Sequence, residues 1–344
     1  MRRAEVVVVG AGVMGSAAAA ALAGAGRDVV VLERFRLGHD RGSSHGRSRI
    51  FRFSYGERRY VRMAMEALPM WRELEERAGE VVLRTTGGLD LGGGVKEHAS
   101  ALEAEGAEFE VLDEAQAGRR FPFVTFPPGP ALFQPDAGVL LADRALVAFQ
   151  RMVVRDGGEL FERRPARSVI ADGRAAVVET DAETYRADVV VVTSGGWVRD
   201  LLTPAGIVVP VTPTRETIAY FALDEALPVP AIVEWNRPAG YALRSPGQGI
   251  KAGQHGTGPE TDPNEEGSVR DETVARVADW VRRRFPDADP EPHLAETCIY
   301  TSTADESFVL ERHGPVVVGS ACSGHGFKFA PWIGRKLAVL AGRA

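Results

Sequence analysis

The chain opens with two short apolar runs that are separated by a segment of small residues. Glu5–Val9 and Asp28–Leu32 predict buried parallel strands, and Val13–Ala25 between them predicts a helix. This order of strand, helix and strand is typical of a βαβ unit.

Further along, helical periodicity alternates with strand-like runs. The pattern predicts helices at Arg58–Glu76, Leu140–Val154, Val269–Phe285 and Pro331–Leu340. It predicts strands at Ser168–Val178 and Thr184–Thr193, and antiparallel strands at Thr212–Phe221 and Ala231–Leu243. Gly- or Pro-rich composition predicts turns or loops at Gly87–Gly94, Phe121–Pro130 and Gly253–Gly267.

These elements predict an α/β fold in which two domains are interleaved. A doubly wound, dinucleotide-binding domain is expected to take residues 1–80, 138–210 and 298–344. A second, α+β domain with a mixed or antiparallel sheet is expected to hold the substrate and to take residues 81–137 and 211–297.

Composition and charge narrow the class of protein. The 344 residues are 44% hydrophobic and carry a net charge of -6, which gives no reason to expect nucleic acid as a partner. No apolar run reaches the roughly 18–20 residues of a membrane span, and Val6–Val9 is too short for a targeting segment. Two cysteines are too few for a disulfide framework, so a cytoplasmic setting is expected.

The first strand runs into a glycine motif that is typical of dinucleotide binding. Gly10 permits the tight turn, Gly12 lets the backbone approach a pyrophosphate, and Gly15, directly after Met14, allows close helix packing. Glu33 follows 18 residues after Gly15, where a carboxylate can accept from ribose hydroxyls. The motif by itself does not distinguish NAD from FAD.

Four segments beyond the glycine motif carry the remaining candidate residues. They are Gly42–Arg52, Gly249–His255, Cys298–Thr301 and Ser323–Lys328. Taken singly, their residues have ordinary readings, because a lone cysteine is most often a small buried hydrophobe and a lysine a solvated surface charge. Lysine is scarce in this chain, however, and occurs only at Lys96, Lys251, Lys328 and Lys336. A retained lysine can therefore mark a compact ammonium that arginine does not replace.

Together, these four segments resemble the monomeric sarcosine oxidase and N-methyltryptophan oxidase family of FAD-dependent amine oxidases. The resemblance runs over most of the chain and implies the same two-domain layout and a monomer. It implies FAD linked by a thioether to Cys298, with Cys322 as a structural cysteine. It also implies cofactor contacts in the glycine motif and at Glu33, Ser43, His45, Gly324, His325, Gly326 and Lys328, with backbone N–H groups of the last segment facing the flavin.

The resemblance also implies roles in catalysis and substrate binding. Arg52 and Lys328 would bind the substrate carboxylate, and Arg49 would lie near the flavin ring. His255, Tyr241 and Tyr300 would line the amine pocket. Lys251 would activate oxygen, since a fixed ammonium stabilises the superoxide anion that the first electron transfer produces.

The expected reaction is therefore oxidation of sarcosine or a similar N-methyl amino acid, with oxygen as acceptor, to the amino acid, formaldehyde and hydrogen peroxide. No metal is expected, because no CxxC or HExxH motif occurs. Three alternatives stay open at this point: an amine oxidase of cyclic imino acids or glycated amines, a nicotinamide-dependent dehydrogenase, and a non-catalytic nucleotide-binding module.

Overall fold

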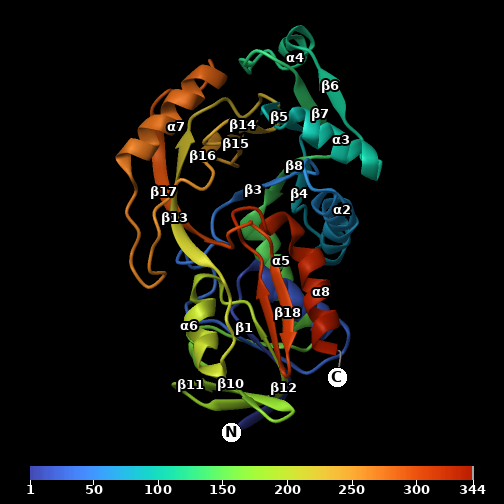
Figure 1. Ribbon diagram of the computed structural model, residues 1–344, viewed down its shortest axis with the longest axis vertical. Coiled ribbons are helices and arrows are strands. Elements are labelled where there is room, and N and C mark those ends of the chain that lie inside the picture. Colours follow the sequence, from blue (N-terminus) through green and yellow to red (C-terminus); the bar gives the residue numbers. More distant parts are fainter. Residues whose placement is uncertain (343–344) are drawn as a thin grey trace.

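The computed structural model describes residues 1–342 as a mixed α/β fold with two large sheets and a small one (Figure 1). This confirms the predicted fold class. Within the described residues, no helix is long and apolar enough to cross a membrane.

The first large sheet has a parallel centre. Its strands are β1 (Arg2–Val9), β2 (Val29–Leu32), β9 (Glu159–Phe161), β10 (Ala166–Asp172), β11 (Ala175–Thr180), β12 (Thr184–Val192), β18 (Val309–His313) and β19 (Val316–Ser320). β9, β2, β1, β12 and β19 run parallel, while β10, β11 and β18 add antiparallel pairs at the edges. β12 pairs with β11 through its first half and with β19 through its last residues.

Helices cover both faces of this sheet. Alternate residues of β1 point to opposite sides, so each face of the sheet is apolar and is buried against helices. Val6 and Val8 face a core shared with α1 (Val13–Gly24), α2 (Arg58–Ala78), α5 (Ala142–Arg155) and α8 (Ala330–Gly342), whereas Val7 and Val9 face a core shared with α6 (Val198–Leu202). The predicted run of small residues brings α1 and α8 close together. A Cβ on Gly334 would lie 2.6 Å from the carbonyl carbon of Ala17, so the contact requires glycine.

The second large sheet lies at the other end of the molecule (Figure 1). Its order is β17 (Pro292–Ser302), β13 (Thr212–Phe221), β16 (Ile250–Gln254), β15 (Gly240–Arg244), β14 (Ala231–Trp235), β5 (Gly88–Gly92), β7 (Ala131–Gln134) and β6 (Glu110–Leu112). The remaining helices near it are α3 (Val95–Glu105), α4 (Glu114–Arg120) and α7 (Asp271–Arg284), and only β14 and β5 pair in parallel. A small sheet of β3 (Ser48–Phe51), β8 (Gly138–Leu141) and β4 (Leu83–Thr85) lies between the two. The domain boundaries stay a prediction, and β17 crosses the one expected at residue 298.

Several predicted elements differ from the structure. Two predicted strands are divided by a turn, one predicted turn contains a strand, and one predicted helix begins later. The single strand predicted at Ser168–Val178 is the hairpin of β10 and β11, which turns at Gly173 with φ +63°. The segment Ala231–Leu243 is likewise two strands, β14 and β15, paired antiparallel. The region Gly87–Gly94, predicted as a turn, contains β5, because its glycines alternate with buried Leu89 and Leu91. Leu140 and Leu141 belong to β8 and not to the helix that follows.

Candidate active site

One cavity of about 750 Å³ extends from the first sheet to the second. It begins at the carboxyl ends of β1, β2 and β12 and continues past the Gly42–Arg52 segment to the face of β14, β15 and β16. This is where open α/β sheets bind ligands. All the site residues predicted from the sequence line it, except Gly15, which packs beneath it.

The glycine motif forms the first end of this cavity as predicted by its spacing. Gly10 has φ +101°, and a Cβ there would lie 2.7 Å from the carbonyl oxygen of Thr193. A Cβ on Gly15 would lie 1.9 Å from the carbonyl oxygen of Gly10. α1 begins after Gly12 with no side-chain cap, so the positive end of its dipole faces the cavity. A phosphate would be stabilised there.

Glu33 lies at the end of β2, where the sequence predicts a ribose-binding carboxylate. Its two oxygens accept hydrogen bonds from the backbone N–H groups of Ala11 (2.8 Å) and Phe35 (2.9 Å). Burial raises the pKa of Glu33, but the hydrogen bonds from His39, Phe35 and Ala11 outweigh burial and leave that pKa below its usual value. Glu33 is therefore ionised at neutral pH and can accept further hydrogen bonds.

Arg49 holds the loop before β3 in its folded shape. Its guanidinium donates to the carbonyl oxygens of Ser43 (2.9 Å), His45 (2.7 Å) and Ser48 (2.8 Å). Ser43 in turn donates through Oγ to the carbonyl oxygen of Ile299 (2.5 Å), which ties the loop to β17. Ser44, which the sequence did not single out, accepts from the backbone N–H of Val13 (3.0 Å) at the start of α1.

His45 is a half-buried residue of the cavity wall, and its Nε2 atom is buried. Its Nε2 makes no hydrogen bond within residues 1–342. Burial and the charge of Arg49 lower the pKa of His45 to about 4, so the ring is neutral at pH 7. The free nitrogen, the N-terminus of α1 and the glycine cradle together fit a dinucleotide cofactor such as FAD.

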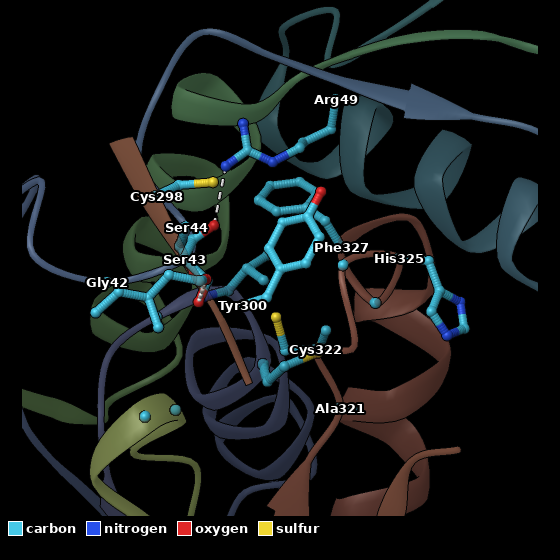
Figure 2. A pocket seen from close by; sticks show the side chains of 18 of the residues that line it. Gly42, Ser43, Ser44, Arg49, Cys298, Tyr300, Ala321, Cys322, His325 and Phe327 are labelled. Atoms are coloured by element: carbon cyan, nitrogen blue, oxygen red, sulfur yellow. Dashed lines mark hydrogen bonds between the residues drawn. The ribbon is translucent and has the colours of Figure 1, made fainter. Parts of the chain in front are cut away.

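Both cysteines face this cavity (Figure 2). Cys298, on β17, is buried, and its burial raises the pKa of the thiol to about 11 against the opposing effect of Arg49 and Lys251. Cys322, interpreted from the sequence as a structural cysteine, is half-buried and also lines the cavity. Both thiols are unpaired. Two cysteines, and not one, are thus within the region predicted to hold the flavin.

Lys251 lies on β16 with only 4% of its surface exposed. Within the described residues its Nζ makes one hydrogen bond, to the carbonyl oxygen of Ser48 at 3.4 Å. Burial and the neighbouring Arg49 lower the pKa of Lys251 to about 7. The sequence correctly singled out this lysine as one that solvent does not surround.

The turn between β19 and α8 brings glycines against the aromatic wall of the cavity. Gly324 has φ +69°, and a Cβ there would lie 2.3 Å from the ring of Tyr300 and 2.6 Å from that of His255. The backbone N–H groups of His325 (2.9 Å) and Gly326 (2.8 Å) donate to the carbonyl oxygen of Cys322. These two N–H groups thus close the turn, and the expectation that backbone N–H groups of this segment face a flavin stays a prediction.

His325 lines the cavity, and both nitrogens of its ring have partners within the protein. Its Nδ1 pairs with the hydroxyl of Tyr55 (3.2 Å), its Nε2 pairs with the carbonyl oxygen of Glu306 (3.0 Å), and its ring stacks on Phe308 at 4.8 Å. In Figure 2 the ring is turned away from Cys298. With both nitrogens engaged by the protein, His325 supports the turn.

Three rings form the wall expected around an amine. The hydroxyl of Tyr241 approaches Gly253, whose Cβ would lie 2.6 Å from it, and burial raises the pKa values of both Tyr241 and Tyr300. The ring of His255 is centred 5.5 Å from that of Tyr300. Its Nε2 pairs with Glu306 at 3.2 Å, a carboxylate in the cavity wall that the sequence did not indicate as functional.

Arg52 and Lys328, far apart in the sequence, meet at Tyr55. The guanidinium carbon of Arg52 lies 4.1 Å from the centre of the Tyr55 ring, and Lys328 donates through Nζ to the Tyr55 hydroxyl at 2.9 Å. Both cations are buried, yet both line the cavity. Burial and the charge of Arg52 lower the pKa of Lys328 well below its usual value. Two buried cations with unfilled donor capacity form a receptor for an anion.

Comparison with known proteins assigns this arrangement to a group of flavoenzymes. The family profile for FAD dependent oxidoreductases matches residues 5–340. The chain is 34% identical to the peroxisomal sarcosine oxidase of Homo sapiens, over 97% of this chain and 90% of that protein. It is 33% identical to a monomeric sarcosine oxidase of Bacillus sp., over 98% and 92%. The solved structure of NikD, an unusual amino acid oxidase of nikkomycin biosynthesis, matches with a TM-score of 0.90 at 28% identity, over 100% of this chain and 95% of that one.

Proposed function

The chain belongs to the family of FAD-dependent oxidoreductases, and we propose that it oxidises sarcosine or a similar N-methyl amino acid with oxygen as acceptor. One observation carries the choice of substrate. Arg52 and Lys328 form a buried pair of cations in the same cavity as Lys251 and the aromatic wall. An amino acid presents its carboxylate and its amine only a few ångströms apart, as such a site requires.

The residues of this chain would bind and orient the substrate. Arg52 and Lys328 hold the carboxylate by charge-assisted hydrogen bonds. Tyr241, Tyr300 and His255 enclose the amine and keep water away from it, which strengthens the electrostatic contacts. FAD, when bound, would supply the hydride-accepting and oxygen-reducing chemistry.

FAD would be held by the glycine motif, by Glu33 and by the loop that contains Ser43 and His45. We infer that Cys298 carries the covalent link, as the family resemblance implies, although the thiol at Cys322 lines the same cavity. Lys251 supplies the ammonium beside the site of oxygen reduction, where it stabilises developing negative charge.

Two further properties follow as proposals. A monomer as the active unit is supported by the similarity to a relative that is named a monomeric sarcosine oxidase. A cytoplasmic setting is supported by the low cysteine content.

A substrate panel tests the proposal. Hydrogen peroxide release is measured with sarcosine, larger N-methyl amino acids, proline and pipecolate. The N-methyl amino acids are expected to give peroxide together with formaldehyde. Peroxide from proline or pipecolate alone would favour an oxidase of cyclic imino acids. A yellow protein that releases no peroxide with any of them would refute the proposal.

A further inference from the structure

A buried aspartate lies behind the predicted carboxylate receptor, at a position to which the sequence assigned no role. Asp90, on β5, is 1% exposed. The indole Nε1 of Trp235 donates to its Oδ1 at 2.5 Å, and Nε2 of Gln134 donates to its Oδ2 at 2.6 Å. β5 lies between β14 and β7, and the register makes Trp235 and Gln134 diagonal neighbours of Asp90 on one face of the sheet.

The hydrogen bonds continue from Gln134 to the backbone beside Arg52. Oε1 of Gln134 accepts from the backbone N–H groups of Phe53 and Ser54, both at 2.9 Å. These are the two residues that directly follow Arg52. Gln134 is fully buried, and its amide orientation is fixed because Oε1 accepts on one side while Nε2 donates on the other.

Trp235, which donates to Asp90, also packs against Arg52. The guanidinium carbon of Arg52 lies 4.8 Å from the centre of the Trp235 ring and 4.1 Å from that of Tyr55. Arg52 is 8% exposed and donates to Oγ of Ser54 at 3.3 Å. Two aromatic rings therefore pack against the guanidinium, and the N–H groups that Ser54 does not engage are left for a carboxylate, which can accept two parallel hydrogen bonds from them.

We propose that Asp90, Gln134 and Trp235 are positioning residues that fix the plane of Arg52 and so determine that this site selects a carboxylate. The inference rests on the proposed function, because it takes Arg52 as the carboxylate receptor. Asp90 and Gln134 are not among the residues that line the cavity, whereas Trp235 lines it with its Nε1 bound to Asp90.

Charge supports the same arrangement. Burial raises the pKa of the Asp90 carboxyl, but the neighbouring His98 and Arg52 outweigh it, so that its pKa lies below the usual value. His98 lies with Nδ1 3.6 Å from Oδ1 of Asp90 and packs edge-on against Trp235 at 4.9 Å. An ionised Asp90 can only accept hydrogen bonds, which fits the two donors that reach it.

This pattern of donors and acceptors leads to a sharp test. In Asp90→Asn the new amide has one oxygen and one NH2 group. With the oxygen toward Trp235, the NH2 group meets the NH2 group of Gln134. A flip of Gln134 would relieve that clash, but it would withdraw the acceptor from Phe53 and Ser54. The double variant Asp90→Asn with Gln134→Glu restores every donor–acceptor pair, since the carboxylate and the amide exchange places.

The measured quantity is the dissociation constant of acetate, a carboxylate that is not oxidised, from its effect on the flavin absorbance. Asp90→Asn is expected to weaken acetate at least about 10-fold, and the double variant is expected to recover affinity to within about 3-fold of wild type. Trp235→Phe keeps a ring over Arg52 but removes the donor to Asp90, and it should weaken acetate about 3- to 10-fold. KM for the N-methyl amino acid should rise in parallel, with a smaller change in kcat.

Trp280→Phe is the matched control. Trp280, on α7, donates through Nε1 to buried Glu234 of β14 at 2.6 Å, and neither residue is among those that line the cavity. The Trp280→Phe variant should bind acetate as tightly as wild type does. This control separates the general effect of losing a buried indole–carboxylate hydrogen bond from the specific effect of losing the one at Asp90. If Asp90→Asn alone does not fold, the double variant and Trp235→Phe carry the test.

Acetate affinity within twofold of wild type in both Asp90→Asn and Trp235→Phe would overturn the inference. A double variant no tighter than Asp90→Asn would overturn it as well. Failure of the proposed function looks different, because acetate would then not bind wild type, or Arg52→Met would bind it unchanged. If Arg52→Met loses acetate while the Asp90 and Trp235 variants keep it, only the positioning role fails.

Discussion

Replacing Lys251 with methionine is expected to change two properties in opposite directions. The substitution keeps an unbranched side chain of similar length but removes an ammonium that is 4% exposed and has one hydrogen bond, to the carbonyl oxygen of Ser48. Losing a fixed charge beside a developing anion costs about 2.7–4 kcal/mol of transition-state stabilisation, or roughly 10²–10³-fold in rate. Reoxidation by oxygen should slow by that factor.

Folding stability should rise at the same time. The pKa of Lys251 falls from its ordinary value of 10.5 to about 7, mainly because of burial. A difference of this size corresponds to about 5 kcal/mol, as an order of magnitude, lost by burying the ammonium at pH 7. The unfolded chain keeps this proton up to about pH 10.5, whereas the folded chain releases it above about pH 7. The unfolded chain therefore binds more protons between these values, and wild-type stability rises with pH across that range.

Two assays follow from this reasoning. Stopped-flow spectroscopy times flavin bleaching by substrate without oxygen, and then reoxidation on mixing with oxygen. Urea unfolding of the cofactor-free protein at pH 7 and pH 9.5 measures the stability difference, which should shrink at the higher pH. Lys96→Met, at an exposed lysine on α3, is the control for both. Slow bleaching with normal reoxidation in Lys251→Met would place Lys251 on the substrate side and refute the argument.

Three further predictions concern the cofactor link, the carboxylate receptor and the turn after β19. Acid-precipitated wild type should stay yellow, and Cys298→Ala should release the colour whereas Cys322→Ala should not; the reverse result would move the covalent link to Cys322, which lines the same cavity. Arg52→Ala should weaken substrate and competing carboxylates alike by about 1.5–3 kcal/mol, and unchanged inhibition constants for both would contradict its role. Gly324→Ala should lower the free energy of unfolding by about 2 kcal/mol more than Gly314→Ala. Both glycines have positive φ, but only at Gly324 would the new Cβ meet side chains within 4 Å, so equal losses in two denaturation curves would show that strain alone matters.

Individual strands, turns and helices could be predicted from the sequence because the residues that determine each of them are neighbours in the chain. The continuous apolar run in Glu5–Val9 and the glycines that follow specify a strand, a tight turn and a helix through steric limits on neighbouring residues. The predicted element boundaries are wrong where glycine, which is typical of turns, is part of a strand. In β5, glycines that read as a turn are the small members of a buried strand, which only its neighbours β14 and β7 make stable.

The sequence alone determined the type of cofactor-binding fold and which segments carry the chemistry, since backbone conformation and motif spacing are local properties. Only the tertiary structure decided which side chains meet. Arg52 and Lys328 meet because Tyr55 contacts both, and sheet pairing places Trp235 and Gln134 beside Asp90. The physical reason is that charge, hydrogen bonding and desolvation act over a few ångströms in space, and the distance between residues along the chain does not reveal that separation.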